Sequence, residues 1–169
     1  MIRQAKYQDA ESIQNLLRIF SETGKVLFRP LDDIRENILS FWVYEKNNDI
    51  AGVYSLKTGW GRFVELRSLG VDPQYSNQGI GTKMVEESIK NALSTDCDTL
   101  FVLTYAVSMF ARLGFSVVDK EKLPHKVWSD CNACLHQENC DETAMVISLV
   151  SMRKSSTAHI LPDSAIRVA

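Results

Sequence analysis

One twelve-residue segment constrains the fold of this chain more than any other. It reads Val71-Asp72-Pro73-Gln74-Tyr75-Ser76-Asn77-Gln78-Gly79-Ile80-Gly81-Thr82. An apolar run ends at Val71, Pro73 stops the strand, and a loop with two glycines leads into a helix. Backbone N–H groups without partners and the positive end of a helix dipole then converge, which suits a phosphate or diphosphate group. The segment predicts an α/β domain with an anion site at a strand-to-helix turn.

The two glycines alone leave the kind of loop open. Gly79-Ile80-Gly81 also fits a loop that merely turns tightly. No Gly-Lys-Ser/Thr follows, so the loop is not of the Walker type, and the GxGxxG spacing of a dinucleotide fold is missing. The rest of the sequence is needed to distinguish an anion-binding loop from a simple tight turn.

Periodicity predicts the order β-α-α-β-β-β-α-β-α-β-β, an α/β domain with a mixed, mostly antiparallel sheet. Helices are expected after Asp9, after Pro30, from the glycines to about Ser94, and over residues 107–113. Asn47-Asn48-Asp49 forms a hairpin turn between two of the strands. The predicted strands are residues 2–5, 41–46, 50–58, 63–71, 99–104, 115–119 and 143–150. The polar segment from Ser151 is expected to be irregular.

Length and charge narrow the class of protein. The 169 residues favour one domain, here 1–150 with a cysteine-containing loop at 123–142, followed by a tail of unknown role at 151–169. The formal net charge of −2 gives no basic field for nucleic acid or anionic lipid, and no apolar run approaches the roughly 20 residues that span a bilayer. The first residues lack the pattern of a signal peptide, so we expect a cytoplasmic protein with reduced cysteines.

Three segments resemble the GCN5-related N-acetyltransferase (GNAT) family over residues 2 to about 150. The strand ending in Val71 and the glycine segment resemble the family's acetyl-CoA motif, Val-x-Pro followed by Arg/Gln-x-x-Gly-x-Gly/Ala. The run from Met109 to Phe115 is similar to the later signature Phe-Tyr-x-x-Leu-Gly-Phe, and the opening residues match the usual start. The resemblance implies a GNAT fold with helices flanking a sheet, splayed central strands, and acetyl-CoA as cosubstrate.

The resemblance also implies the cosubstrate site. The pantetheine arm would pair with the backbone of Leu69, Gly70 and Val71, where an N–H group can polarise the thioester carbonyl. Ser76 stands where the family usually has Arg or Gln, so one side-chain contact to the diphosphate is shortened or lost. The diphosphate-binding amides would come from Asn77, Gln78, Gly79, Ile80, Gly81 and Thr82.

Two residues are candidates for proton transfer. Glu65 matches the strand glutamate that some relatives use as a general base, although Arg67 shares its face in a regular strand and would make it a poorer base. A structural or substrate-orienting Glu65–Arg67 pair is the alternative. Phe110 replaces the family's acidic tyrosine, which leaves Tyr105 as a substitute general acid, with simple packing as its other role.

The acceptor amine is narrowed by a second, less specific resemblance. The strand around Glu65, the loop residue Arg29 and the block from Leu123 to Glu142 look like the short, single-domain bacterial N-acetylglutamate synthases. These enzymes acetylate the α-amine of glutamate at the start of arginine biosynthesis. Arg29, Arg67 and Lys126 would bind the substrate carboxylates, with solvated surface charges as the alternative. The sequence leaves other acceptors possible, namely glutamine, a peptide N-terminus or a lysine. A coenzyme-A-binding sensor without turnover is a further alternative.

The cysteine block allows two interpretations. Cys131, Cys134 and Cys140, with His125 and His136 nearby, have donor types that suit zinc, but the second half of a paired Cys-x2-Cys motif is missing. We favour small thiols packed over the acceptor site and expect no metal. The expected partner is a small amino-acid substrate. The sequence leaves the oligomeric state open, with a homodimer as one option.

Overall fold

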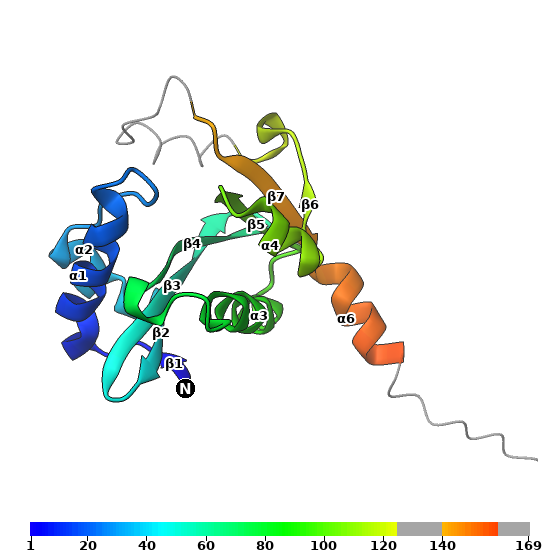
Figure 1. The fold of residues 1–169 in the computed structure, drawn as a ribbon. Helices are drawn as coiled ribbons and strands as arrows, with labels where there is room; N and C mark the ends of the chain where they lie inside the picture. The colour runs from blue at the N-terminus through cyan, green and yellow to red at the C-terminus, as the bar shows by residue number, and fades with distance from the viewer. Residues whose placement is uncertain (125–139, 159–169) are drawn as a thin grey trace, which may run out of the picture.

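The computed structural model describes residues 1–124 and 140–158 of the chain. They form one seven-stranded sheet in the order β1-β2-β3-β4-β5-β7-β6 (Figure 1). Neighbouring strands are antiparallel except for β4 and β5, which run parallel. The strands are β1 (Ile2–Gln4), β2 (Phe41–Lys46), β3 (Asp49–Trp60), β4 (Phe63–Val71), β5 (Thr99–Thr104), β6 (Ser116–Val117) and β7 (Thr143–Ser148).

Helices cover both faces of this sheet, α1 and α2 on one side and α3 and α4 on the other (Figure 1). Short 3-10 turns join several elements, and none of the described helices is long and apolar enough to cross a bilayer. The helices are α1 (Ala10–Ser21), α2 (Leu31–Glu36), α3 (Ile80–Leu93), α4 (Val107–Arg112) and α6 (Leu149–Ala158).

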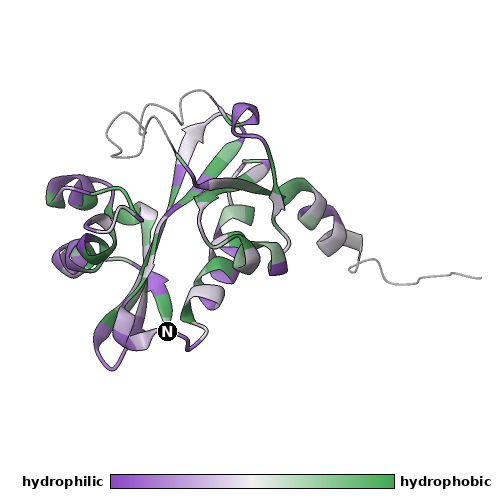
Figure 2. Ribbon diagram, turned by 45° about the horizontal axis from the view of Figure 1, so that its top comes forward, coloured by the Kyte–Doolittle hydropathy of each residue, from purple (hydrophilic) through white to green (hydrophobic). Residues whose placement is uncertain are grey.

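Each layer has its own apolar core, which follows the amphipathic pattern of the helices (Figure 2). On one face, Ile13 and Leu17 of α1 pack with Phe41 and Val53 of the sheet. On the other face, the larger cluster combines Met84, Val85 and Ile89 of α3 with apolar residues of β3, β4 and β5. The sheet therefore separates two apolar cores. A ligand can contact both faces only where neighbouring strands separate or at an edge of the sheet.

A β-bulge in β4 changes which residues of this strand face which layer. Val53 pairs with Gly70 and Ser55 with Arg67, so the one residue between them on β3 opposes Ser68 and Leu69 on β4. Ser68 adopts a left-handed backbone conformation with φ of +54°. As a result Leu69 contributes to the α3-side core, whereas Gly70 faces α1, where an added Cβ would lie 2.9 Å from the ring of Phe20.

Most predicted elements are confirmed, but several bounds differ. The strand predicted at 143–150 ends at Ser148, and α6 begins at Leu149. The strand predicted at 115–119 is only two residues long, and the helix after Pro30 ends at Glu36 and is followed by a 3-10 turn at Ile38–Ser40. The hairpin turn uses Asn47 and Asn48 alone, both with positive φ, and β3 already begins at Asp49.

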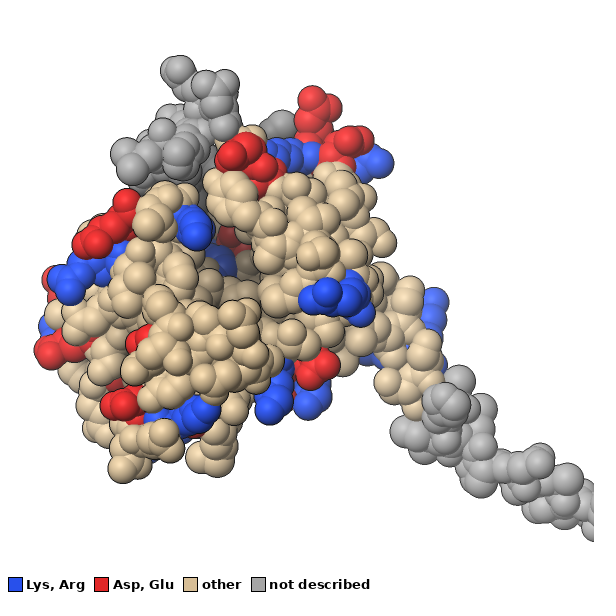
Figure 3. Space-filling view, in the orientation of Figure 1, with Lys and Arg blue, Asp and Glu red and all other residues tan. Residues whose placement is uncertain are grey.

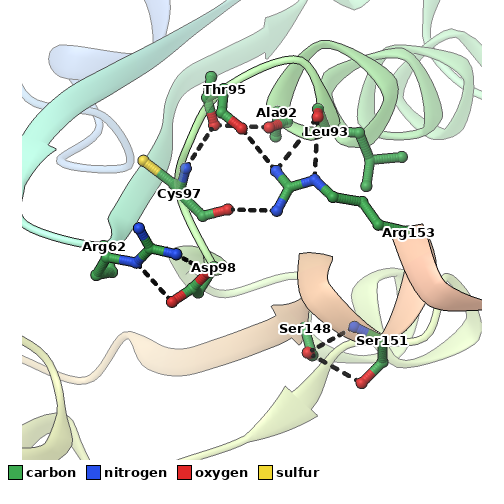
Figure 4. A network of polar contacts seen from close by, with 9 residues as sticks. All are labelled: Arg62, Ala92, Leu93, Thr95, Cys97, Asp98, Ser148, Ser151 and Arg153. Atoms are coloured by element: carbon green, nitrogen blue, oxygen red, sulfur yellow. Dashed lines mark hydrogen bonds and ion pairs between the residues drawn. The ribbon is translucent and has the colours of Figure 1, made fainter.

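The expectation of an irregular segment from Ser151 was wrong, because α6 continues the chain to Ala158. The side chain of Arg153 connects this helix to the rest of the domain. The guanidinium of Arg153 donates to the backbone oxygens of Leu93, Thr95 and Cys97, which belong to the C-terminal end of α3 and the loop after it (Figure 4). The carbonyls at a helix end lack partners in the helix itself, so this arginine satisfies them from outside. The predicted domain boundary at 150 falls inside α6.

Candidate active site

The glycine loop, which we define as residues 76–81, presents backbone amides at the start of α3. Asn77 and Gly79 have φ of +60° and +73°, and the N–H group of Lys83 makes the first helical bond, 3.1 Å to the oxygen of Gly79. The N–H groups of Ile80, Gly81 and Thr82 precede this bond and have no acceptor within the helix. Because α3 is 14 residues long, its dipole adds a partial positive charge at this end. The loop can therefore bind an anion, as the sequence predicts.

The central strands separate next to this loop. β4 and β5 pair only at Phe63–Thr99, Val64–Leu100 and Glu65–Phe101, although β4 continues to Val71. The splay expected from the sequence is thus present. Beyond Glu65, the edge of β4 that faces β5 is open to an extended ligand, which would bind as an added strand does.

A cavity of about 710 Å³ occupies the gap between the two strands. Leu66 to Leu69 of β4 form one wall, and Val102 to Tyr105 form the opposite wall. The loop between α1 and α2 closes a third side with Phe28 and Pro30. This volume falls within the usual range for small-molecule sites.

Charged groups of both signs line this mostly apolar cavity. Figure 3 shows the surface hollowed there, with acidic and basic side chains in the depression. The charged residues that line the cavity are Lys25, Glu65, Arg67 and Glu142. Atoms Oε2 of Glu65 and Nε of Arg67 are buried, so their charges act through a poorly solvated medium.

The bulge does not separate Glu65 from Arg67. It lies after Arg67, while Glu65 pairs with Lys57 and Arg67 with Ser55 in regular register. Both side chains therefore line the same cavity, as strand alternation predicts.

Tyr105 lies at the end of β5 and lines the cavity, with 46% of its surface exposed. Its hydroxyl donates a 2.8 Å hydrogen bond to Oδ1 of Asp141. Desolvation and this carboxylate together raise the pKa of the Tyr105 hydroxyl. In this arrangement the proton points at Asp141. Phe110 is 1% exposed and stacks edge-on against Phe115, as a core residue does.

The predicted carboxylate-binding residues lie at different places. Arg67 lines the cavity, whereas Arg29 lies between two lining residues, with its guanidinium 3.8 Å from the carboxylate of Asp33. Lys126 falls outside the described residues, as do Cys131, Cys134, His125 and His136. Among the described residues no cluster of three metal-ligating side chains occurs.

Sequence reasoning missed part of the cavity wall. Phe20 and Lys25 enter it because α1 is followed by a loop that folds over β4, and Thr104 enters it because β5 diverges from β4. Cys140 and Glu142 were noted only as parts of the cysteine block, and the structure places both in the wall. Polar residues at the ends of strands were the available signal.

The fold and site together define a class of protein, in which two parallel strands splay apart around a cavity and the first of them leads into an anion-binding helix start. Residues 8–115, more than half of the chain, match the model of the Acetyltransferase (GNAT) family. An uncharacterized N-acetyltransferase of Chlorobaculum tepidum is 32% identical over 148 residues, which cover 88% of this chain and 96% of that protein. The chain belongs to the GNAT acetyltransferase family.

Two further relatives carry more specific names. The amino-acid acetyltransferase of Mycobacterium tuberculosis is 28% identical over 77% of this chain and 76% of its own length. The N-acetylglutamate synthase of Neisseria gonorrhoeae, solved with coenzyme A and N-acetyl-glutamate, aligns with a TM-score of 0.79 at 26% identity. That alignment covers 88% of this chain and only 35% of the Neisseria chain. The predicted fold, the N-acetyltransferase activity and acetyl-CoA as cosubstrate are confirmed.

Proposed function

We propose that this enzyme transfers the acetyl group of acetyl-CoA to the α-amine of L-glutamate, by direct attack in a ternary complex. The observation that supports this most is the cavity between β4 and β5, which joins the open strand edge to a concave space with charges of both signs. Opposite charges in one mostly apolar cavity suit a small zwitterion, whereas a peptide needs a continuous groove. Relatives named amino-acid acetyltransferases, and the Neisseria synthase solved with N-acetyl-glutamate, favour the same acceptor class.

In the proposed complex the cosubstrate occupies the anion-binding end of α3 and the open edge of β4. Amides of residues 77–82 would hold its diphosphate, and the backbone of residues 69–71 would pair with pantetheine. The thioester carbonyl then lies at the divergence of β4 and β5, where a backbone N–H group of β4 stabilises the negative oxygen.

Glu65 is the proposed general base. It takes one proton from the α-ammonium, and the neutral amine attacks the thioester carbon to give a tetrahedral intermediate. The carbon–sulfur bond then breaks, and the second proton of the attacking nitrogen passes to the thiolate, directly or through water. In a relay through Tyr105, the hydroxyl would first have to leave Asp141, to which it donates in the structure. Arg67, Arg29 and Lys126 would bind the two carboxylates of glutamate. A cytoplasmic location and a homodimer stay predictions.

Thiol release from acetyl-CoA with a panel of acceptors tests the proposal. The panel contains glutamate, aspartate, glutamine, lysine and a short peptide with a free N-terminus. We expect saturable release with glutamate at the highest kcat/KM. Preference for another amino acid would overturn the glutamate assignment, preference for the peptide would support a peptide acetyltransferase, and binding without release would support a coenzyme-A sensor.

The Arg29→Ala variant tests the acceptor side separately. Loss of a charge-assisted bond to a carboxylate is expected to raise the KM for glutamate by about tenfold or more, with the KM for acetyl-CoA nearly unchanged. Arg18→Ala is a matched control, because Arg18 is an exposed arginine of α1 whose side chain pairs with Glu22. Equal effects on both substrates would count against the role of Arg29.

A further inference from the structure

The glycine loop, residues 76–81, contains no lysine or arginine. Coenzyme A carries its negative charge on a diphosphate and on a 3′-phosphate, and the glycine loop has Ser76 at the position expected for a basic or amide side chain. Backbone amides and a helix dipole supply only partial charges. A full positive charge near the loop must come from a lysine or arginine side chain outside it. Lys83 follows the loop in the first turns of α3 and is exposed, and a second lysine reaches the loop from another element.

Lys46 of the β2–β3 hairpin lies at this place. Val71 pairs with Gly52, and the N–H group of Asp72 donates 2.9 Å to the oxygen of Ala51, so the start of β3 lies beside the end of β4. The tight turn at Asn47 and Asn48 brings the end of β2 to the same edge, with Lys46 paired to Asp49.

The side chain of Lys46 points at the glycine loop. Its Nζ donates a short hydrogen bond to Oε1 of Gln78 and lies 5.2 Å from the ring centroid of Tyr75. Gln78 immediately precedes Gly79, whose carbonyl starts the helical bonding of α3. The ammonium group therefore contacts the side chain of a residue whose own backbone amide is among those that would bind the diphosphate.

We propose that Lys46 is a cosubstrate-binding residue that contacts a phosphate of coenzyme A beside the glycine loop and replaces the side chain missing at Ser76. Gln78 and Tyr75 are its positioning residues, because they hold the flexible lysine against the loop before the ligand arrives. An ammonium ion is a strongly hydrated point charge that binds phosphate without a fixed geometry, which suits a lysine reaching in from a neighbouring hairpin. This inference rests on the placement of the diphosphate in the proposed function.

Calorimetric titration of coenzyme A into the Lys46→Gln and Lys46→Arg variants tests the proposal. We expect Lys46→Gln to raise the Kd by about three- to tenfold at low salt, and the difference to shrink at high salt because exposed charges are screened. Lys46→Arg, which keeps the charge, should bind nearly as the wild type does. Melting temperatures of all variants verify that the fold is intact.

Lys90→Gln is the matched control. It removes the same charge from α3, on an exposed side chain that bonds Glu87 at 3.1 Å and lies about 15 Å along the helix from Ile80. Titration with dephospho-coenzyme A identifies the phosphate: an equal loss with both ligands assigns Lys46 to the diphosphate, and a loss with coenzyme A alone assigns it to the 3′-phosphate.

Three results would overturn the proposal. They are an unchanged Kd in Lys46→Gln, an equal loss in Lys46→Arg, and a loss that does not respond to salt, which would indicate a structural role through Gln78. Failure of the wild type itself to bind would instead contradict the placement of the cosubstrate, so the two failures are distinguishable.

Discussion

Glu65 and Arg67 occupy adjacent positions on one face of β4 and line the same cavity. Their opposite charges share a poorly solvated cavity, where they attract each other more strongly than in water. A carboxylate that binds and deprotonates an ammonium ion must be free of such a partner, so the substrate must compete for it. Glutamate would do so, because its carboxylates compete for the arginine while its ammonium group approaches Glu65.

The variant Glu65→Gln tests this role. Removal of a general base is expected to lower kcat by about 10²- to 10⁴-fold and to remove the acid limb of the pH–rate profile, while the Kd for coenzyme A stays the same. Glu142→Gln is a suitable comparison, because Glu142 lines the same cavity. A large loss in Glu142→Gln together with near-normal activity in Glu65→Gln would assign the base to Glu142.

The two glycines of the loop have different reasons for being glycine. Gly79 has φ of +73°, whereas a Cβ on Gly81 would make ordinary contacts at 3.8 Å with Met109 and Val71. We expect Gly79→Ala to cost about 1–2 kcal/mol of unfolding free energy and to raise the Kd for coenzyme A about tenfold, because the loop must shift. Gly81→Ala should change neither quantity much. Denaturant unfolding and calorimetry measure both, and equal behaviour of the two variants would contradict the backbone argument.

At the scale of elements, ion pairs and caps join segments that are distant in the chain. Arg3 of β1 pairs with Asp9 at 2.7 Å and with Glu45 of β2 at 2.6 Å. Asp9 also accepts the N–H group of Lys6 at 2.7 Å, which fixes the turn into α1. The hydrogen bond from Arg3 is the main cause that lowers the pKa of the Asp9 carboxyl, against the opposing effect of burial.

This pKa gives a pH dependence with a definite sign. A carboxyl group whose pKa is lower in the folded state stabilises the fold above its unfolded pKa, about 3.9, and loses that contribution as pH falls through the folded value. Asp9→Asn should therefore lower the unfolding free energy by about 1–3 kcal/mol at pH 7, with the difference vanishing in strong acid. Asp32→Asn, at a side chain 88% exposed, is the control. A difference that stays constant from pH 7 to pH 2 would contradict the assignment.

The cap that α6 supplies to α3 can be measured in the same way. Arg153→Ala is expected to cost about 1–3 kcal/mol, because it leaves three backbone oxygens without their donor (Figure 4). The Arg153→Lys variant keeps the charge but lacks the planar guanidinium fork, so only partial recovery is expected. Lys154→Ala, at an exposed neighbour in the same helix, should be nearly neutral. Thermal unfolding checks all three, and a neutral Arg153→Ala would show that α6 does not support α3.

For the molecule as a whole, the local sequence pattern predicted the strands of the sheet and the glycine loop. It did not predict the bulge in β4 or the cavity between β4 and β5. Periodicity gave β4 and β5 to the residue, because both are buried strands with clear ends. The bulge at Ser68 had no local signal, since serine rarely adopts positive φ and the conformation is imposed by packing on both faces. The cavity likewise depends on how far two strands diverge, which is a tertiary property.

The helix α6 and the position of Lys46 were not predicted from the sequence, for related reasons. The helix α6 has a weak apolar pattern, and it is held in place by the bonds of Arg153 to a distant loop. Lys46 looks like an ordinary charge beside a turn, and its proximity to Gln78 follows only from the strand order β2-β3-β4. Both lie outside what spacing along the chain can predict.

The proposed chemistry requires the cosubstrate to bind at the start of α3 with its thioester directed into the cavity. A crystal structure of the protein with coenzyme A and N-acetylglutamate measures this directly. We predict the diphosphate within hydrogen-bond distance of the amides of residues 77–82, pantetheine along residues 69–71 of β4, and the acetyl group beside Glu65 in the cavity between β4 and β5. Density for the diphosphate away from the start of α3, or for the amino acid outside this cavity, would contradict this placement of the two substrates.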